Sequence, residues 1–178
     1  SYGYEGKVNP EVCLFCTKIS AQMSKVYSLK AVQKIPAEIN TVWDFFSRAE
    51  NLLKITPADM KFKVVSKHHG ERVYPGQILE YKVTPIFGIS FYWMTEITHV
   101  APQRYFADEQ RYGPFSLWHH QHHFQEIEGG VEMTDIIHYK LPLSILGDIA
   151  HSLLIRKKLK ALLDYRYKKV EELFGRFY

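Results

Sequence analysis

The sequence predicts an α+β protein in which a curved, seven-stranded antiparallel sheet wraps around a long C-terminal helix, with two short helices after the first strand. Three observations predict this fold. Segments that alternate between apolar and polar residues fill the middle of the chain, and turn dipeptides separate them about every 12 residues. One long amphipathic run ends the chain. Because a single sheet cannot cover its own apolar face, we expect this last helix to pack on it.

The first third of the chain predicts one strand and two short helices. Residues 26–35 are rich in β-forming side chains and alternate loosely, which favours a strand. The segment that Pro36 opens has apolar residues at helical spacing through Phe46, and a second short helix spans 51–55. Six further strands are predicted between the turn dipeptides, at 60–68, 77–84, 88–100, 103–112, 115–127 and 131–141.

The C-terminal helix, at about 144–174, carries one apolar face over its last two-thirds. The residues on this face are Ile155, Leu159, Leu162, Leu163, Val170, Leu173 and Phe174. The lysines of this helix fall outside the apolar face and are Lys157, Lys158, Lys160, Lys168 and Lys169. A strongly curved sheet around one helix need not fill its interior, so the architecture predicts a cavity for an apolar small molecule.

Composition excludes several classes of protein. The 178 residues suffice for one domain, and 46% of them are apolar, which excludes global disorder. The net charge of +4 comes entirely from 151–178, so there is no general case for nucleic-acid binding. There is no apolar run long enough for a membrane span and no readable secretory signal. Two cysteines make no disulfide framework, so we expect a cytoplasmic protein.

The start of the chain is predicted to lie outside the domain. Residues 1–22 mix Gly, Pro and Asn without a sustained period, whereas a clean strand pattern follows, so we place the domain at 23–178. Cys13 and Cys16 have the spacing of half a zinc site, but the other half is missing because the chain has no further cysteine. We therefore predict no metal site at this pair. For the whole chain we likewise predict no metal and no cofactor, although one interpretation of the histidine cluster described next would require a metal.

Four of the nine histidines fall within 119–123. Side chains alternate on a strand, so Trp118, His120, His122 and Phe124 share the face that we expect to point inward. A tight turn at Gly129-Gly130 would set Phe124 opposite Asp135, His122 opposite Ile137 and His120 opposite Tyr139. Asp135 would then lie diagonally across from His122, within reach of its ring.

Three interpretations of this inner patch remain open. It could be a satisfied hydrogen-bonded network, an acid–base pair acting on a bound ligand, or a metal site for which Asp135 is the only obvious third ligand. The face of Asp108 and Gln110 depends on a turn that the sequence leaves undetermined. Arg166 falls within the apolar arc of the last helix, so it should meet a carboxylate of Asp108, Asp135 or Glu38, or reach the rim.

The order of elements resembles the helix-grip fold of the START-like superfamily, also called SRPBCC, polyketide-cyclase-like or birch-pollen-allergen-type. It is most similar to bacterial ligand-binding SRPBCC domains of unassigned function. The resemblance covers about 25–175, and the stretches that carry it are PAEINTVWDFF at 36–46, GPFSLWHHQHHF at 113–124, MTD at 133–135, LP at 141–142 and DYR at 164–166. Such domains include carriers, cyclases, dehydratases and lipid-transfer domains, so the resemblance implies a ligand cavity without fixing the chemistry.

We therefore predict a domain that binds or carries an apolar or amphipathic small molecule between the sheet and the C-terminal helix. The predicted ligand-binding residues are Tyr81, Phe91, Trp93, Trp118, His120, His122, Phe124, Asp135, Ile137 and Tyr139. One alternative is a cyclase- or dehydratase-like enzyme that uses His120 or His122 with Asp135. Another is an interaction module that uses the basic face of the C-terminal helix. The oligomeric state stays open.

Overall fold

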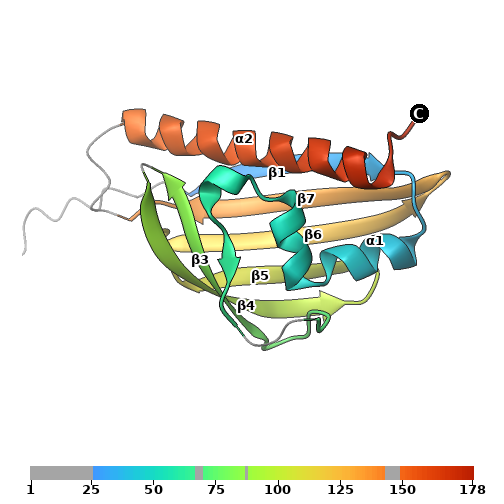
Figure 1. The fold of residues 1–178 in the computed structure, drawn as a ribbon, viewed down its shortest axis with the longest axis horizontal. Helices are drawn as coiled ribbons and strands as arrows, with labels where there is room; N and C mark the ends of the chain where they lie inside the picture. Colours follow the sequence, from blue (N-terminus) through green and yellow to red (C-terminus); the bar gives the residue numbers. More distant parts are fainter. Residues whose placement is uncertain (1–25, 67–69, 87, 143–148) are drawn as a thin grey trace, which may run out of the picture.

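The computed structural model describes residues 26–66, 70–86, 88–142 and 149–178. Seven antiparallel strands form one curved sheet in the order β1-β7-β6-β5-β4-β3-β2, and one long helix runs along its concave side (Figure 1). The fold predicted from the sequence is confirmed. Cys13 and Cys16, with the rest of the proposed extension, lie outside the described residues.

The elements follow in chain order, with a run of short helices between the first two strands. They are β1 (Tyr27–Ile35), α1 (Ile39–Phe46), the 3-10 helices η2 (Ala49–Ile55) and η3 (Ala58–Met60), β2 (Lys63–Val64), β3 (Ile78–Ile86), β4 (Ile89–Ala101), β5 (Tyr105–Tyr112), β6 (Leu117–Ile127), β7 (Gly130–Lys140) and α2 (Ile149–Phe174).

The predicted strand at 60–68 is wrong for most of its described residues, because only Lys63 and Val64 form a strand there. The 3-10 helix η3 occupies 58–60, and Lys61 ends it in a left-handed conformation with φ of 44°, so the strand begins late and β2 holds only two residues. The predicted start of the last helix, at 144–148, lies outside the described residues.

The pairing of β6 with β7 differs from the predicted register by two residues. His122 lies opposite Asp135 and His120 opposite Ile137, because Glu128 and Gly129 form the turn and Gly130 already belongs to β7. Gly129 has φ of +81°, which the turn requires and which glycine adopts without strain. A shift by two residues preserves the face of every side chain, so the predicted inward set still points inward.

Helix α2 packs on two separate clusters of buried residues. Its C-terminal part, with Val170 and Phe174, contacts the cluster that contains Trp43 and Phe106. Ile155, Leu159 and Leu163 pack against the second cluster, which consists of Trp118, Ile137 and Tyr139. Leu173, predicted on the buried face, is 49% exposed. The helix is therefore anchored at two places along its length, and the space between them is available for a cavity.

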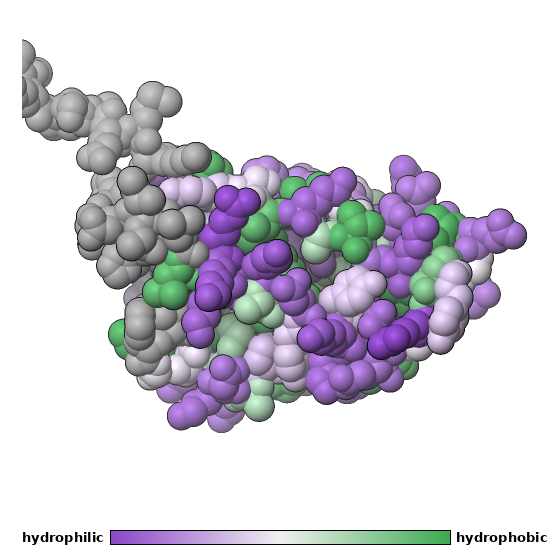
Figure 2. Space-filling view, turned by 90° about the horizontal axis from the view of Figure 1, so that it is seen from above, coloured by the Kyte–Doolittle hydropathy of each residue, from purple (hydrophilic) through white to green (hydrophobic). Residues whose placement is uncertain are grey.

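The outer surface on the side of α2 is mostly hydrophilic, with separate hydrophobic residues between polar ones (Figure 2). Lys157, Lys158, Lys160 and Lys168 are exposed there, as the sequence predicts, and Lys169 is partly buried beside Glu172. In the described part of the chain no helix combines the length and the hydrophobicity needed to cross a membrane.

Candidate functional site

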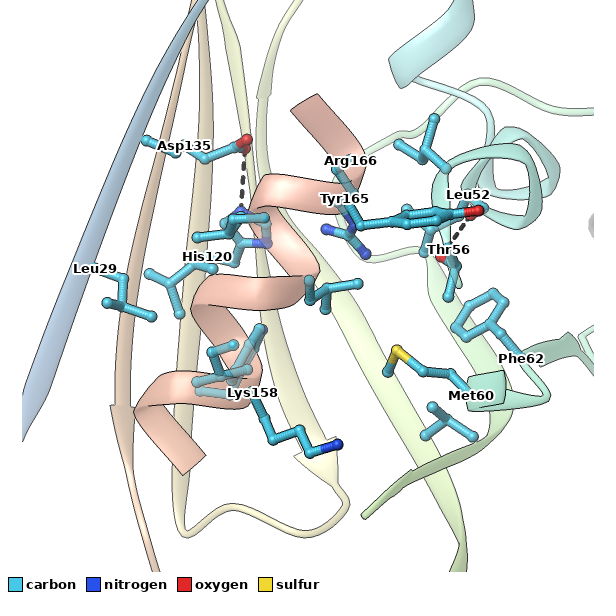
Figure 3. A pocket seen from close by; sticks show the side chains of 18 of the residues that line it. Leu29, Leu52, Thr56, Met60, Phe62, His120, Asp135, Lys158, Tyr165 and Arg166 are labelled. Atoms are coloured by element: carbon cyan, nitrogen blue, oxygen red, sulfur yellow. Dashed lines mark hydrogen bonds and ion pairs between the residues drawn. The ribbon is translucent and has the colours of Figure 1, made fainter. Parts of the chain in front are cut away.

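A large cavity lies between the concave face of the sheet and α2. Its volume is about 1340 Å³, which is room for about 45 water molecules at roughly 30 Å³ each. The lining comes from β1, from the inner faces of β3 to β7, from α2, and from the segment 46–62. Helix α2 runs between the wall that carries His120 and Asp135 and the wall that carries Met60 and Phe62 (Figure 3). The sheet and the helix therefore do not close on each other.

Four polar residues form one compact cluster on the sheet side of this cavity. Asp108 on β5 lies opposite His120 on β6, and Asp135 on β7 lies opposite His122 on β6, so three neighbouring strands bring the group together. His120 and His122 are only 4% and 8% exposed, and their ring centroids are 3.8 Å apart. The group contains both histidines that the sequence predicted as inward-facing, with a carboxylate on either side of them.

The two carboxylates contact the imidazoles from opposite directions. Asp135 Oδ1 lies 3.2 Å from His120 Nε2, with which it is hydrogen-bonded, and 2.7 Å from His122 Nδ1. Asp108 Oδ2 lies 3.4 Å from His122 Nε2 and 3.7 Å from His120 Nδ1. The hydroxyl of Thr95 donates to the other oxygen of Asp108 at 3.1 Å. Each histidine therefore presents one nitrogen to each carboxylate.

The pKa values of the two histidines are shifted in opposite directions. Burial alone would lower the pKa of His122, but Asp135 and Asp108 outweigh it and raise that pKa to about 9. The pKa of His120 is lowered, first by burial and then by the charge of His122. Burial would raise the pKa values of Asp108 and Asp135, but the histidines hold both below their ordinary range. At neutral pH these directions favour two carboxylates, an imidazolium at His122 and a neutral ring at His120.

Arg166 extends from α2 into the same cavity (Figure 3). Its Nε is buried and has no hydrogen-bond partner, and among the described residues no carboxylate forms an ion pair with it. Burial lowers the pKa of its guanidinium, although the charges of Asp135 and Asp108 act in the opposite direction. The expected direct partner is therefore not found, and Arg166 faces the cavity with its charge only partly compensated at a distance.

Most of the predicted ligand-binding residues lie in the cavity lining. These are Tyr81, Phe91, Trp93, Trp118, His120, His122, Asp135 and Ile137. Trp93, Trp118 and Phe115 form an aromatic group with ring centroids 4.9–5.7 Å apart. Phe124 and Tyr139 are buried but lie outside the lining. Phe124 packs edge-on against Trp43, and Tyr139 stacks on Tyr27.

The wall opposite the sheet was not predicted as part of the site. Leu52, Thr56, Met60 and Phe62 line it from the 3-10 helices and the loop that follows them. Such short helices repeat no apolar period, so the sequence offers little beyond the apolar content of 52–62 to indicate this wall. Asp108, whose face the sequence left open, points inward.

The chain matches the family described as polyketide cyclase / dehydrase and lipid transport over residues 35–177. It belongs to this family. The match covers β2 to β7, the short helices and α2, and it confirms the resemblance to the SRPBCC superfamily. The family description spans both enzymes and lipid-transport proteins, so membership by itself leaves the activity open.

Solved structures with the same fold are distant in sequence. Protein Ms6760 from Mycobacterium smegmatis is 18% identical, with a TM-score of 0.60, and the match covers 84% of this chain and 96% of that one. The ginseng major latex-like protein 151 from Panax ginseng is 16% identical, with a TM-score of 0.58 and coverage of 84% and 97%. TTHA0849 from Thermus thermophilus is 17% identical, with a TM-score of 0.58, and the match covers 83% of this chain and 99% of that one. No curated protein matches the chain.

Proposed function

We propose that this protein binds an amphipathic small molecule in the cavity between the sheet and α2. The single observation that carries the proposal is the cavity of about 1340 Å³, with apolar and aromatic walls and one compact polar cluster. Ligand sites in proteins are typically concave, mostly apolar, and fitted with a few polar groups that fix orientation. Membership of a family that includes lipid-transport proteins supports the same proposal.

The distribution of polar groups argues for an amphipathic ligand rather than a purely apolar one. Water in an apolar cavity lacks hydrogen-bond partners, so an apolar ligand body gains free energy by replacing it beside Trp93 and Trp118. The buried Nε of Arg166, which has no hydrogen-bond partner, instead needs a polar one, because an unpaired buried polar group costs about 1–3 kcal/mol. A ligand with one polar group and a large apolar body satisfies both requirements.

Two neighbouring leucines allow a matched test of the cavity. Leu52 lines it, whereas Leu53 is 47% exposed and does not line it. We expect Leu52→Trp to weaken binding of the fluorescent amphipathic dye anilinonaphthalene sulfonate by at least about tenfold, a loss of about 1.4 kcal/mol. Leu53→Trp should leave binding unchanged. Native mass spectrometry of the freshly purified protein tests in parallel for a co-purified small molecule.

The outcomes separate the proposal from its alternatives. Equal dye binding by both tryptophan variants would place the ligand elsewhere and contradict the proposal. A cyclase- or dehydratase-like reaction with His120 or His122 and Asp135 stays a prediction, and conversion of a bound ligand into a product of different mass would support it. An interaction module on the lysine face of α2 also stays a prediction, and salt-sensitive binding to anionic vesicles that Lys157→Gln and Lys158→Gln abolish would support it.

A further inference from the structure

We propose that Asp108, His120 and His122 form a three-ligand Zn²⁺ site on the cavity wall, with a fourth coordination position open toward the cavity. Each of the three residues offers one ligand atom, and these atoms lie within 4.8 Å of one another. All three residues line the cavity. This inference goes beyond the proposed ligand binding and does not depend on it.

The separations on the Asp108 side fit metal coordination better than hydrogen bonding. Asp108 Oδ2 lies 3.4 Å from His122 Nε2 and 3.7 Å from His120 Nδ1. A buried, charge-assisted N–H···O bond would bring such atoms to about 2.7–2.9 Å. Ligand atoms at about 2.0–2.1 Å from a tetrahedral Zn²⁺ are about 3.3 Å from one another. The two separations from Asp108 Oδ2 are therefore close to those of neighbouring ligand atoms around one small cation.

The opposite side of the two imidazoles has the spacing of an outer coordination shell. Asp135 Oδ1 lies 3.2 Å from His120 Nε2 and 2.7 Å from His122 Nδ1, which are distances of the hydrogen-bond range. Histidines that bind a metal through one nitrogen nearly always donate the other N–H to a carboxylate or carbonyl oxygen. Asp135 is therefore hydrogen-bonded to His120 and lies in contact with His122 Nδ1, which has no hydrogen bond of its own, and the other nitrogen of each ring is on the side of Asp108.

A neighbouring side chain, Thr95, also orients Asp108. Thr95 donates its hydroxyl to Oδ1 of Asp108 at 3.1 Å, which leaves Oδ2 for the cation. Two histidines and one carboxylate are a ligand set of open zinc sites, in which water or substrate takes the fourth position. The dication also compensates the two buried carboxylates. A ligand oxygen that enters the fourth position would be polarised by the metal acting as a Lewis acid.

The third ligand in this proposal is a different aspartate from the one that the sequence suggests. Asp135 is the only obvious third ligand in the sequence, where the signal for a metal is weak. In the structure the register sets Asp108 opposite His120 and Asp135 opposite His122. Asp108 therefore completes the set of ligands and Asp135 supports it.

The test measures binding of Zn²⁺ to the full chain after chelator treatment. The parent carries Cys13→Ser and Cys16→Ser, since this pair could bind zinc by itself. We expect one Zn²⁺ per chain by calorimetry in competition with a weak chelator, and a tetrahedral Co²⁺ spectrum on cobalt substitution. Asp135→Asn should weaken Zn²⁺ binding by about 10–100-fold, as for other outer-shell partners.

Ligand and control variants decide the assignment. His122→Ala and Asp108→Asn should each weaken Zn²⁺ binding more than Asp135→Asn does, whereas His119→Ala, on the other face of β6, should leave it unchanged. Absence of stoichiometric binding in the parent, or equal binding by His122→Ala, Asp108→Asn and the parent, would overturn the proposal. If these variants fail to fold, X-ray absorption of the zinc-loaded parent decides, because two imidazoles with oxygen ligands support the site and six oxygen ligands contradict it.

Discussion

Replacing Arg166 with methionine should make the protein more stable. The guanidinium has a buried Nε without a partner and no ion pair among the described residues. Burial lowers its pKa in spite of Asp135 and Asp108. A base whose pKa is lower in the folded state than in the unfolded state binds its proton less tightly when folded. The charge therefore costs folding free energy at every pH below that pKa.

The expected gain in stability can be estimated from substitutions of buried charged side chains in other proteins. Exchange of buried charged side chains for well-packed apolar ones of similar volume is often neutral or stabilising by about 1–4 kcal/mol. For a domain of this size each kcal/mol changes the melting temperature by about 2–4 °C. We therefore expect Arg166→Met to raise the melting temperature by about 2–16 °C. The two aspartates lose little, because His120 and His122 already contact both of them.

Differential scanning calorimetry of ligand-free protein at neutral pH checks this expectation. Lys158→Met is the matched control, since Lys158 lies on the same helix but is exposed, and its effect should stay within about 0.5 kcal/mol. Dye binding measured in parallel should weaken in Arg166→Met, because the cavity loses a cationic group with a buried Nε. A fall in the melting temperature of Arg166→Met beyond that of the control would refute the reasoning, since long-range attraction to the aspartates would then exceed the cost of burial.

Three further predictions concern stability. Hydrogen bonds first from Arg48 and then from Arg72 lower the pKa of Asp44 to about 2. The stabilisation that ionised Asp44 gives the folded state is therefore complete above about pH 3.8 and is lost as the pH falls toward 2. Asp44→Asn should accordingly lower the melting temperature at pH 7 but not at pH 2, and an equal effect at both pH values would contradict this. Gly130→Ala would make a Cβ overlap with the carbonyl oxygen of Ile35, so denaturant unfolding should reveal a loss of about 1–3 kcal/mol, and unchanged stability would exclude this close approach. Trp43→Ala removes a 4%-exposed ring packed on Phe106 and Phe124 and should cost about 3–5 kcal/mol in the same assay, whereas a cost below about 1 kcal/mol would show that the contacts are dispensable.

The sheet and the long helix could be predicted from the sequence because their signals are local. Alternation, turn dipeptides and one apolar helix face each depend on residues close together in the chain. The β6–β7 register could not be predicted, because two adjacent glycines offered two positions for the turn. Gly130 is needed where β7 passes close to the backbone of Ile35 on β1, and only the assembled sheet reveals this contact.

The candidate site was predictable on one wall only. Alternation along β6 placed His120 and His122 on the inner face, and a register error of two residues left that face unchanged. The face of Asp108 depended on the pairing of β4 with β5, where irregularities shift the register at two points. The opposite wall depends on 3-10 helices, which have no sequence period to detect.

The polar cluster and the facing wall belong to parts of the molecule with different freedom to vary. Asp108, His120, His122 and Asp135 occupy three adjoining strands whose backbones are hydrogen-bonded to one another. The facing wall at 49–62 consists of short helical turns that join no strand of the sheet. Exchange of that segment could therefore change the shape of the cavity while the four polar side chains keep their mutual positions. Proteins with this fold could therefore come to bind different ligands while they keep the same polar cluster.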